Sequence, residues 1–65
     1  MIIKYLTTEK YPQDRMSRDW YSVDGVEYAL TDWGELLNEH GVPQVIEGDL
    51  IRVEHELRTY AESLA

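Results

Sequence analysis

The dipeptide Asp24-Gly25, inside the stretch "WYSVDGVEYAL", constrains the fold of this chain more than any other feature. It separates two runs in which apolar and polar residues alternate, the pattern of half-buried β-strands. Asp-Gly is typical of the type I′ turn, which needs a positive φ at both central positions and joins two antiparallel strands tightly. The sequence therefore predicts a β-hairpin whose turn is Asp24-Gly25.

The turn also predicts which residues face one another across the hairpin. Counting outward, Val23 pairs with Val26, and the next pairs are Ser22 with Glu27, Tyr21 with Tyr28, and Trp20 with Ala29. Paired residues share a face of the sheet. One face should therefore be apolar, formed by Tyr21, Val23, Val26, Tyr28 and Leu30. The other face is mixed and carries Trp20, which is either covered by another element or exposed.

The segment before the hairpin predicts a further strand followed by a loop. "IIKYLTT" alternates and is rich in β-branched residues, which favours a strand. "EKYPQDRMSR" is polar and contains Pro12, which fixes one φ angle and lacks a backbone donor, so we expect a loop there.

After the hairpin, "TDWGELLNEHG" predicts a short helix. Thr31 or Asp32 can cap its start, Glu35 stands in capping-box position after Asp32, and Gly41 can end it. The inward stripe would be Trp33, Leu36, Leu37 and His40. The outward stripe would be acidic, formed by Asp32, Glu35 and Glu39.

The end of the chain predicts a second, longer helix over "DLIRVEHELRTYAESL", with Asp49 as its cap. Its apolar residues recur at helical spacing: Leu50, Val53, Leu57, Tyr60 and Leu64. Two i,i+4 pairs, Arg52 with Glu56 and Glu54 with Arg58, should support it. The segment 42–48 between the two helices is ambiguous, either a short strand or a turn.

These elements predict a single α+β domain spanning residues 1–65, an antiparallel three- or four-stranded sheet with two helices packed on one face. The chain contains no cysteine, so neither a disulfide nor a thiolate metal site is expected. It shows neither a signal peptide nor an apolar run long enough to cross a membrane, which favours a cytoplasmic protein.

Charge is distributed unevenly along the chain. Thirteen acidic and six basic residues give a net charge of −7. The segment 19–49 holds eight carboxylates and no lysine or arginine, so the surplus lies in the middle of the chain. Such self-repulsion opposes a compact state, and an explanation for it is needed.

Several classes of function are disfavoured. The helix carries "HEL" at 55–57, but a zinc-protease motif needs a second histidine at 59, where this chain has Thr59. No glycine-rich loop could hold a phosphate, and no cofactor or metal site is expected. Direct binding of nucleic acid is opposed by the negative charge. The sequence therefore predicts a protein that is not an enzyme.

Two interpretations of the acidic segment stay open. The first is a solvated surface that keeps a small protein soluble. The second is mimicry of DNA, in which carboxylates occupy a lysine- and arginine-lined groove while aromatic side chains supply anchoring where bases would stack. The residues expected to contact such a partner are Asp24, Glu27, Asp32, Glu35, Glu39, Glu47, Asp49 and Trp20.

In size, charge and lack of cysteine the chain, including "DGVEYALTDWGELLNE", resembles the small phage-encoded anti-CRISPR proteins that act on type I effector complexes. The resemblance implies a non-enzymatic inhibitor in the host cytoplasm that binds a Cas subunit or the assembled complex. It also implies that target DNA is blocked, often where the protospacer-adjacent motif is read. That family shares no fold and no invariant residues, so no residue role is transferred.

The alternative is a small regulatory or adaptor module that binds a protein through apolar contacts around Trp20 and the hairpin edge. A small enzyme would instead need a pocket with a strongly perturbed carboxylate or histidine. We expect a monomer or a weak dimer, with dimerisation through the sheet face that bears Trp20.

Overall fold

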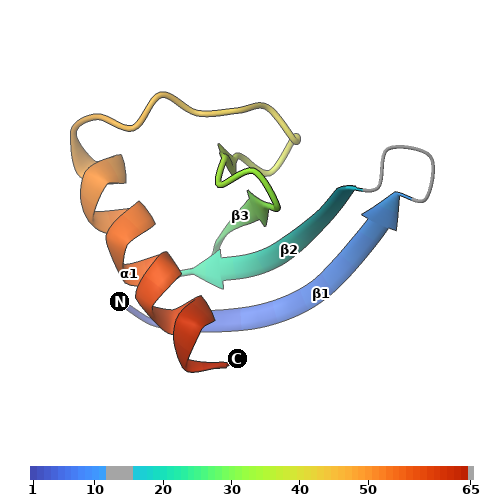
Figure 1. Cartoon of the computed structure of the whole chain (residues 1–65). Helices are drawn as coiled ribbons and strands as arrows, with labels where there is room; N and C mark the ends of the chain where they lie inside the picture. The colour runs from blue at the N-terminus through green and yellow to red at the C-terminus, as the bar shows by residue number, and fades with distance from the viewer. Residues whose placement is uncertain (12–15, 65) are drawn as a thin grey trace.

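The computed structural model describes residues 1–11 and 16–64. Four strands form one antiparallel sheet in the order β1-β2-β3-β4. They are β1 (Ile3–Tyr11), β2 (Met16–Val23), β3 (Val26–Thr31) and β4 (Leu36–Leu37), and a single helix, α1 (Asp49–Ser63), follows. The helix lies against one face of the sheet, with its C-terminal part over β1 (Figure 1). The α+β prediction is confirmed, but the described residues contain one helix where two were predicted.

The hairpin prediction is confirmed in turn and register. Asp24 and Gly25 have φ angles of 50° and 85°, both positive as a type I′ turn requires. Every predicted pair from Val23–Val26 to Trp20–Ala29 is present. The Asp24 carboxylate also accepts a hydrogen bond of 2.7 Å from the backbone N–H of Ile2, which ties the turn to the start of the chain.

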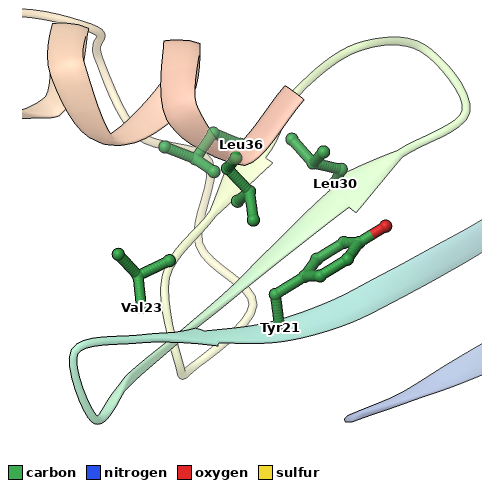
Figure 2. Close-up of a cluster of buried hydrophobic side chains, with 5 residues drawn as sticks. Tyr21, Val23, Leu30 and Leu36 are labelled. Carbon is green, nitrogen blue, oxygen red and sulfur yellow. The ribbon is translucent and has the colours of Figure 1, made fainter. Parts of the chain in front are cut away.

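The hydrophobic core lies between the sheet and the helix. Figure 2 shows Tyr21 and Val23 of β2, Leu30 of β3 and Leu36 of β4 gathered beneath α1. Leu57 of the helix is fully buried in the same cluster. The predicted apolar face is thus confirmed for Tyr21, Val23 and Leu30, whereas Val26 at the end of the hairpin is half-exposed.

The first strand is longer than the sequence indicated. The segment 9–18 was expected to be a loop, but β1 continues to Tyr11 and β2 begins at Met16, with Glu9 facing Arg18 and Tyr11 facing Met16. Backbone pairing between neighbouring strands outweighs the polar composition there. Pro12 of the expected loop falls outside the described residues. The register shifts between Tyr5 and Thr7, which makes Leu6 the extra residue of a β-bulge.

The predicted helix over 31–41 is wrong, and the segment is instead a turn, the two-residue strand β4 and a second turn. Gly34 has a φ of 81°, which a helix cannot contain. Thr31 closes the first turn, since its hydroxyl accepts a hydrogen bond of 3.0 Å from the backbone N–H of Glu35. Asn38 stabilises the second turn, because its side-chain oxygen accepts hydrogen bonds from the backbone N–H groups of His40 and Val42.

Burial of two adjacent leucines explains why a strand forms here. Leu36 and Leu37 are 2% and 3% exposed. In a strand, adjacent side chains point to opposite faces: Leu36 joins the core beneath the helix, and Leu37 pairs with Ala29 on the other face. A helix would have placed Leu36 and Leu37 on one side, beside Trp33, whose side chain is 66% exposed in the structure.

Residues 42–48 contain no regular strand. Pro43 forms an isolated bridge with Leu37, and the backbone N–H of Gln44 donates a 2.9 Å hydrogen bond to the carbonyl of Leu36. Pro43 and Gln44 therefore lie along the outer edge of β4. The remainder leads to Gly48, which precedes the helix.

The final helix is confirmed with three corrections. Its N-cap is Gly48, which makes no side-chain cap, so Asp49 is the first helical residue instead of the cap. Leu50, Val53, Leu57 and Tyr60 pack against the sheet, but Leu64 is 54% exposed. Of the two predicted ion pairs, Glu54–Arg58 is present at 3.4 Å, and the described contacts include no Arg52–Glu56 pair.

A Gly34→Ala variant should lower the free energy of unfolding by about 1–2 kcal/mol, because a side chain at positive φ is strained. Steric conflict adds little, since a Cβ at this position would meet only the Arg58 guanidinium, at an ordinary 3.7 Å. Gly34→Asn is the matched control, because asparagine tolerates positive φ better. Denaturant titration measures both. Equal stability of the alanine variant and the wild type would contradict the turn.

Candidate functional site: an acidic surface centred on Trp20

All seven carboxylates expected to contact a partner are exposed. Within residues 1–11 and 16–64 none of them lies within ion-pair distance of a lysine or arginine. The ion pairs found there are Glu39 with His40 at 3.5 Å and Glu54 with Arg58. His40 is itself exposed and carries a full charge only when protonated. The negative charge of these seven carboxylates is therefore presented to solvent.

Two of these carboxylates have structural partners. The Asp24 carboxylate accepts the hydrogen bond from the backbone N–H of Ile2 described above. Asp32 accepts hydrogen bonds from both the backbone N–H and the hydroxyl of Ser17, at 2.9 and 2.6 Å, which fastens the turn after β3 to the start of β2. The predicted acidic stripe of Asp32, Glu35 and Glu39 does not exist as such, since these residues lie in two separate turns.

Three carboxylates meet around Trp20 on the sheet face opposite the helix. A shallow hollow there is lined by Leu6, Thr7, Glu9, Trp20, Glu27 and Glu39. The pairing of β3 with β4 ends at Ala29 and Leu37, and the turn that follows β4 carries Glu39 to the hollow that Glu27 also lines. Glu35, Glu47 and Asp49 do not line this hollow.

Trp20 and Tyr11 hold Glu9 in place. The indole N–H of Trp20 donates to one carboxylate oxygen of Glu9, and the Tyr11 hydroxyl donates to the other at 2.9 Å. The hydrogen bond to Glu9 is the main cause of a raised pKa for Tyr11. Trp20 is half-buried, so the exposed tryptophan of the molecule is Trp33 instead.

Sequence reasoning missed Glu9 because it fell in the expected loop. Its approach to Trp20 depends on the pairing of Thr7 with Trp20 and of Glu9 with Arg18, and the bulge at Leu6 sets that register. Bulges leave no dependable pattern in a single sequence. Arg18 lies on the same face, with its guanidinium 4.9 Å from the Tyr11 ring centroid, and its Nε is buried without a hydrogen-bond partner among the described residues.

The described part of the chain holds no group of three histidine, cysteine or acidic side chains placed to bind a metal ion. Nor does it contain a helix long and apolar enough to span a membrane. The face around Trp20 presents carboxylates, a half-buried tryptophan and a shallow hollow.

No protein-family model, curated protein or solved structure matches this chain.

Proposed function

We propose that this protein is a non-enzymatic inhibitor that binds the basic, DNA-binding surface of a protein partner and blocks access of DNA to it. The observation that carries the proposal is the exposure of Glu27, Glu39 and the five other carboxylates of 24–49 without a lysine or arginine within ion-pair distance among the described residues. Such a surface is complementary to a groove that binds phosphates. A Cas subunit or an assembled type I effector complex is the proposed target.

The grouping of three carboxylates around Trp20 supports this proposal. Glu9 lies in β1 and Glu27 in β3, the two strands that flank β2, whereas Glu39 lies in the turn after β4. All three carboxylates line one hollow, so the sheet and this turn together present several negative charges on one face. A rigid array of this kind binds a groove with less loss of conformational entropy than a flexible acidic tail would.

Salt and competing DNA test the proposal together. Tagged protein is used to capture partners from a host lysate, and the complex is eluted either with a salt gradient or with duplex DNA. Exposed charges are screened over about 8 Å at physiological ionic strength, so moderate salt should release the partner. Duplex DNA should displace it at low salt. A partner retained against both treatments would contradict mimicry.

Such retention would favour the second candidate, an adaptor that binds through apolar contacts. The observation in its favour is the 66% exposure of Trp33, which makes this residue, instead of Trp20, the available apolar anchor. In that case Trp33→Ala should release the salt-resistant partner, whereas Trp20→Ala should act mainly through loss of the Glu9 contact.

A further inference from the structure

A second recess lies on the opposite face of the sheet, beside the C-terminal end of α1. It is an open cleft with a volume of about 490 Å³, lined by Tyr5, Thr8, Asp19, Tyr21, Ala61 and Leu64. Its residues come from β1, β2, the last turn of α1 and Leu64, which follows the helix where its end crosses β1 (Figure 1). This cleft is separate from the hollow at Trp20, because Asp19 and Trp20 are adjacent in β2 and so belong to opposite faces.

The polar side of the cleft is a hydrogen-bond chain that ends on a carboxylate. The Thr8 hydroxyl donates to Asp19 Oδ1 at 2.7 Å. Its single proton is used there, so at the 2.5 Å contact between Tyr5 and Thr8 the Tyr5 hydroxyl must be the donor. The Tyr5 oxygen keeps its lone pairs available. Asp19 Oδ2 has no hydrogen-bond partner among the described residues.

Aromatic rings form the walls. Tyr5 and Tyr21 meet edge to face, with centroids 5.7 Å apart and an angle of 67° between the rings. Tyr60 supports Tyr21 from the helix at 6.1 Å. In Figure 2 the Tyr21 hydroxyl points away from Val23. Burial raises the pKa of Tyr21, with the Asp19 charge adding to the effect, so its hydroxyl stays neutral at physiological pH.

The cleft is therefore negative and aromatic, and its charge is uncompensated. No lysine or arginine nitrogen of the described residues lies within the 4.0 Å ion-pair distance of Asp19. Aromatic faces next to a carboxylate attract organic cations. Ala61 and the 54%-exposed Leu64 add an apolar side, against which an aliphatic stem can lie.

We propose that this cleft binds the ammonium group of a lysine side chain on the partner protein. A lysine fits better than an arginine, because Asp19 Oδ1 is engaged by Thr8 and a guanidinium binds best to both oxygens of a carboxylate. An ammonium donates three hydrogen bonds, which Asp19 Oδ2 and the tyrosine oxygens can accept. The identity of the partner rests on the function proposed above, but the chemistry of the cleft does not.

The test uses n-butylammonium, which reproduces the lysine side chain, in a titration followed by amide NMR. Saturable shifts are expected at Thr8, Asp19, Tyr21 and Leu64, with a Kd of about 1–10 mM, reasonable for so small a ligand. Asp19→Asn should weaken binding about tenfold or more, because it removes the charge. Glu47→Gln is the matched control: it removes one exposed carboxylate outside the cleft and should leave the Kd unchanged.

Other outcomes would overturn the proposal. Shifts that never saturate and spread over all carboxylates would mean general ion attraction, and equal binding of tetramethylammonium would mean that hydrogen bonding is not involved. If Asp19→Asn does not fold, Leu64→Ser serves instead. Leu64 is exposed at the end of the helix, so the variant should fold, and the affinity for butylammonium should fall several-fold. Unchanged affinity would exclude the cleft.

Because the probe is a small amine, the experiment needs no partner. A cleft that fails to bind butylammonium would leave the salt and DNA competition results standing. Conversely, a partner insensitive to salt and DNA would refute mimicry without affecting the amine titration.

Discussion

A Leu57→Ala variant is expected to lose about half of the free energy of unfolding of this domain. Leu57 is fully buried and joins α1 to Tyr21, Val23, Leu30 and Leu36. Truncating such a leucine lowers the free energy of unfolding by about 2–5 kcal/mol. A domain of this size has a free energy of unfolding of only about 3–10 kcal/mol, so the substitution removes a large part of it. Far-UV circular dichroism with denaturant titration measures the loss.

The same helix provides the matched control. Ile51 is 60% exposed, and Ile51→Ala should change the free energy of unfolding by less than about 0.5 kcal/mol. Isoleucine and leucine lose similar volume on truncation to alanine. The difference in free energy of unfolding between the two variants therefore measures the contribution of burying Leu57. Similar unfolding midpoints would show that α1 does not pack on the sheet through Leu57.

The second large effect is expected on partner binding, from the double variant Glu27→Lys/Glu39→Lys. Both carboxylates line the hollow at Trp20. An exposed charge contributes up to about 1 kcal/mol to a pairing, and reversing it converts attraction into repulsion of similar size. Two reversals should weaken binding by up to about a thousandfold, as measured by calorimetry or by competition with duplex DNA. Asp24 and Asp32 are avoided because their carboxylates hold the fold together.

The control for charge is Glu56→Lys/Glu62→Lys, which shifts the net charge equally but lies on α1, outside that hollow. This variant should bind within a few-fold of the wild type. Equal loss in both double variants would show that the partner senses only the total charge. If neither double variant loses affinity for the partner, the acidic residues serve only to keep the protein soluble.

The hairpin and the last helix were predictable because their signals are local. Asp24-Gly25 determines a turn through the φ angles that its two residues allow, and the register then follows by counting. The helical spacing from Leu50 to Tyr60 likewise depends only on the segment itself, and it matches the packed face of α1. The cap was misplaced by one residue, an ordinary uncertainty at helix ends.

The segment 31–41 was mispredicted because its structure is decided by distant contacts. Spacing around Leu36 and Leu37 suits a helix, and the capping residues agreed with it. In the structure Leu37 is buried beside Ala29 on one face of the sheet, and Leu36 is buried beneath Leu57 on the other. Only a strand places two adjacent side chains on opposite faces, so the segment forms a strand instead of a helix. Gly34 was the one local sign of a break, and a single glycine inside a helical pattern is weak grounds for rejecting a helix.

The sequence indicated which residues belong to the acidic surface, but it did not indicate which of them lie together. All seven carboxylates are exposed as expected, yet only Glu27 and Glu39 meet at Trp20, joined by Glu9 from outside the acidic segment. The cleft at Asp19 was also beyond sequence reasoning, since it requires β1 and the end of α1 to be placed together. Which surfaces meet is a property of topology.

The outer side of β1 has a consequence for behaviour at high concentration. Among the strands of residues 1–11 and 16–64, this nine-residue strand has a neighbour on one side only, and an unpaired edge is a template for association with further copies. At neutral pH the surplus negative charge keeps copies apart. Near the isoelectric point of about 4.5 that repulsion vanishes, which leaves Lys4, Lys10 and the bulge at Leu6 as the barriers to edge-to-edge aggregation. Storage and crystallisation conditions are therefore best kept well above this pH.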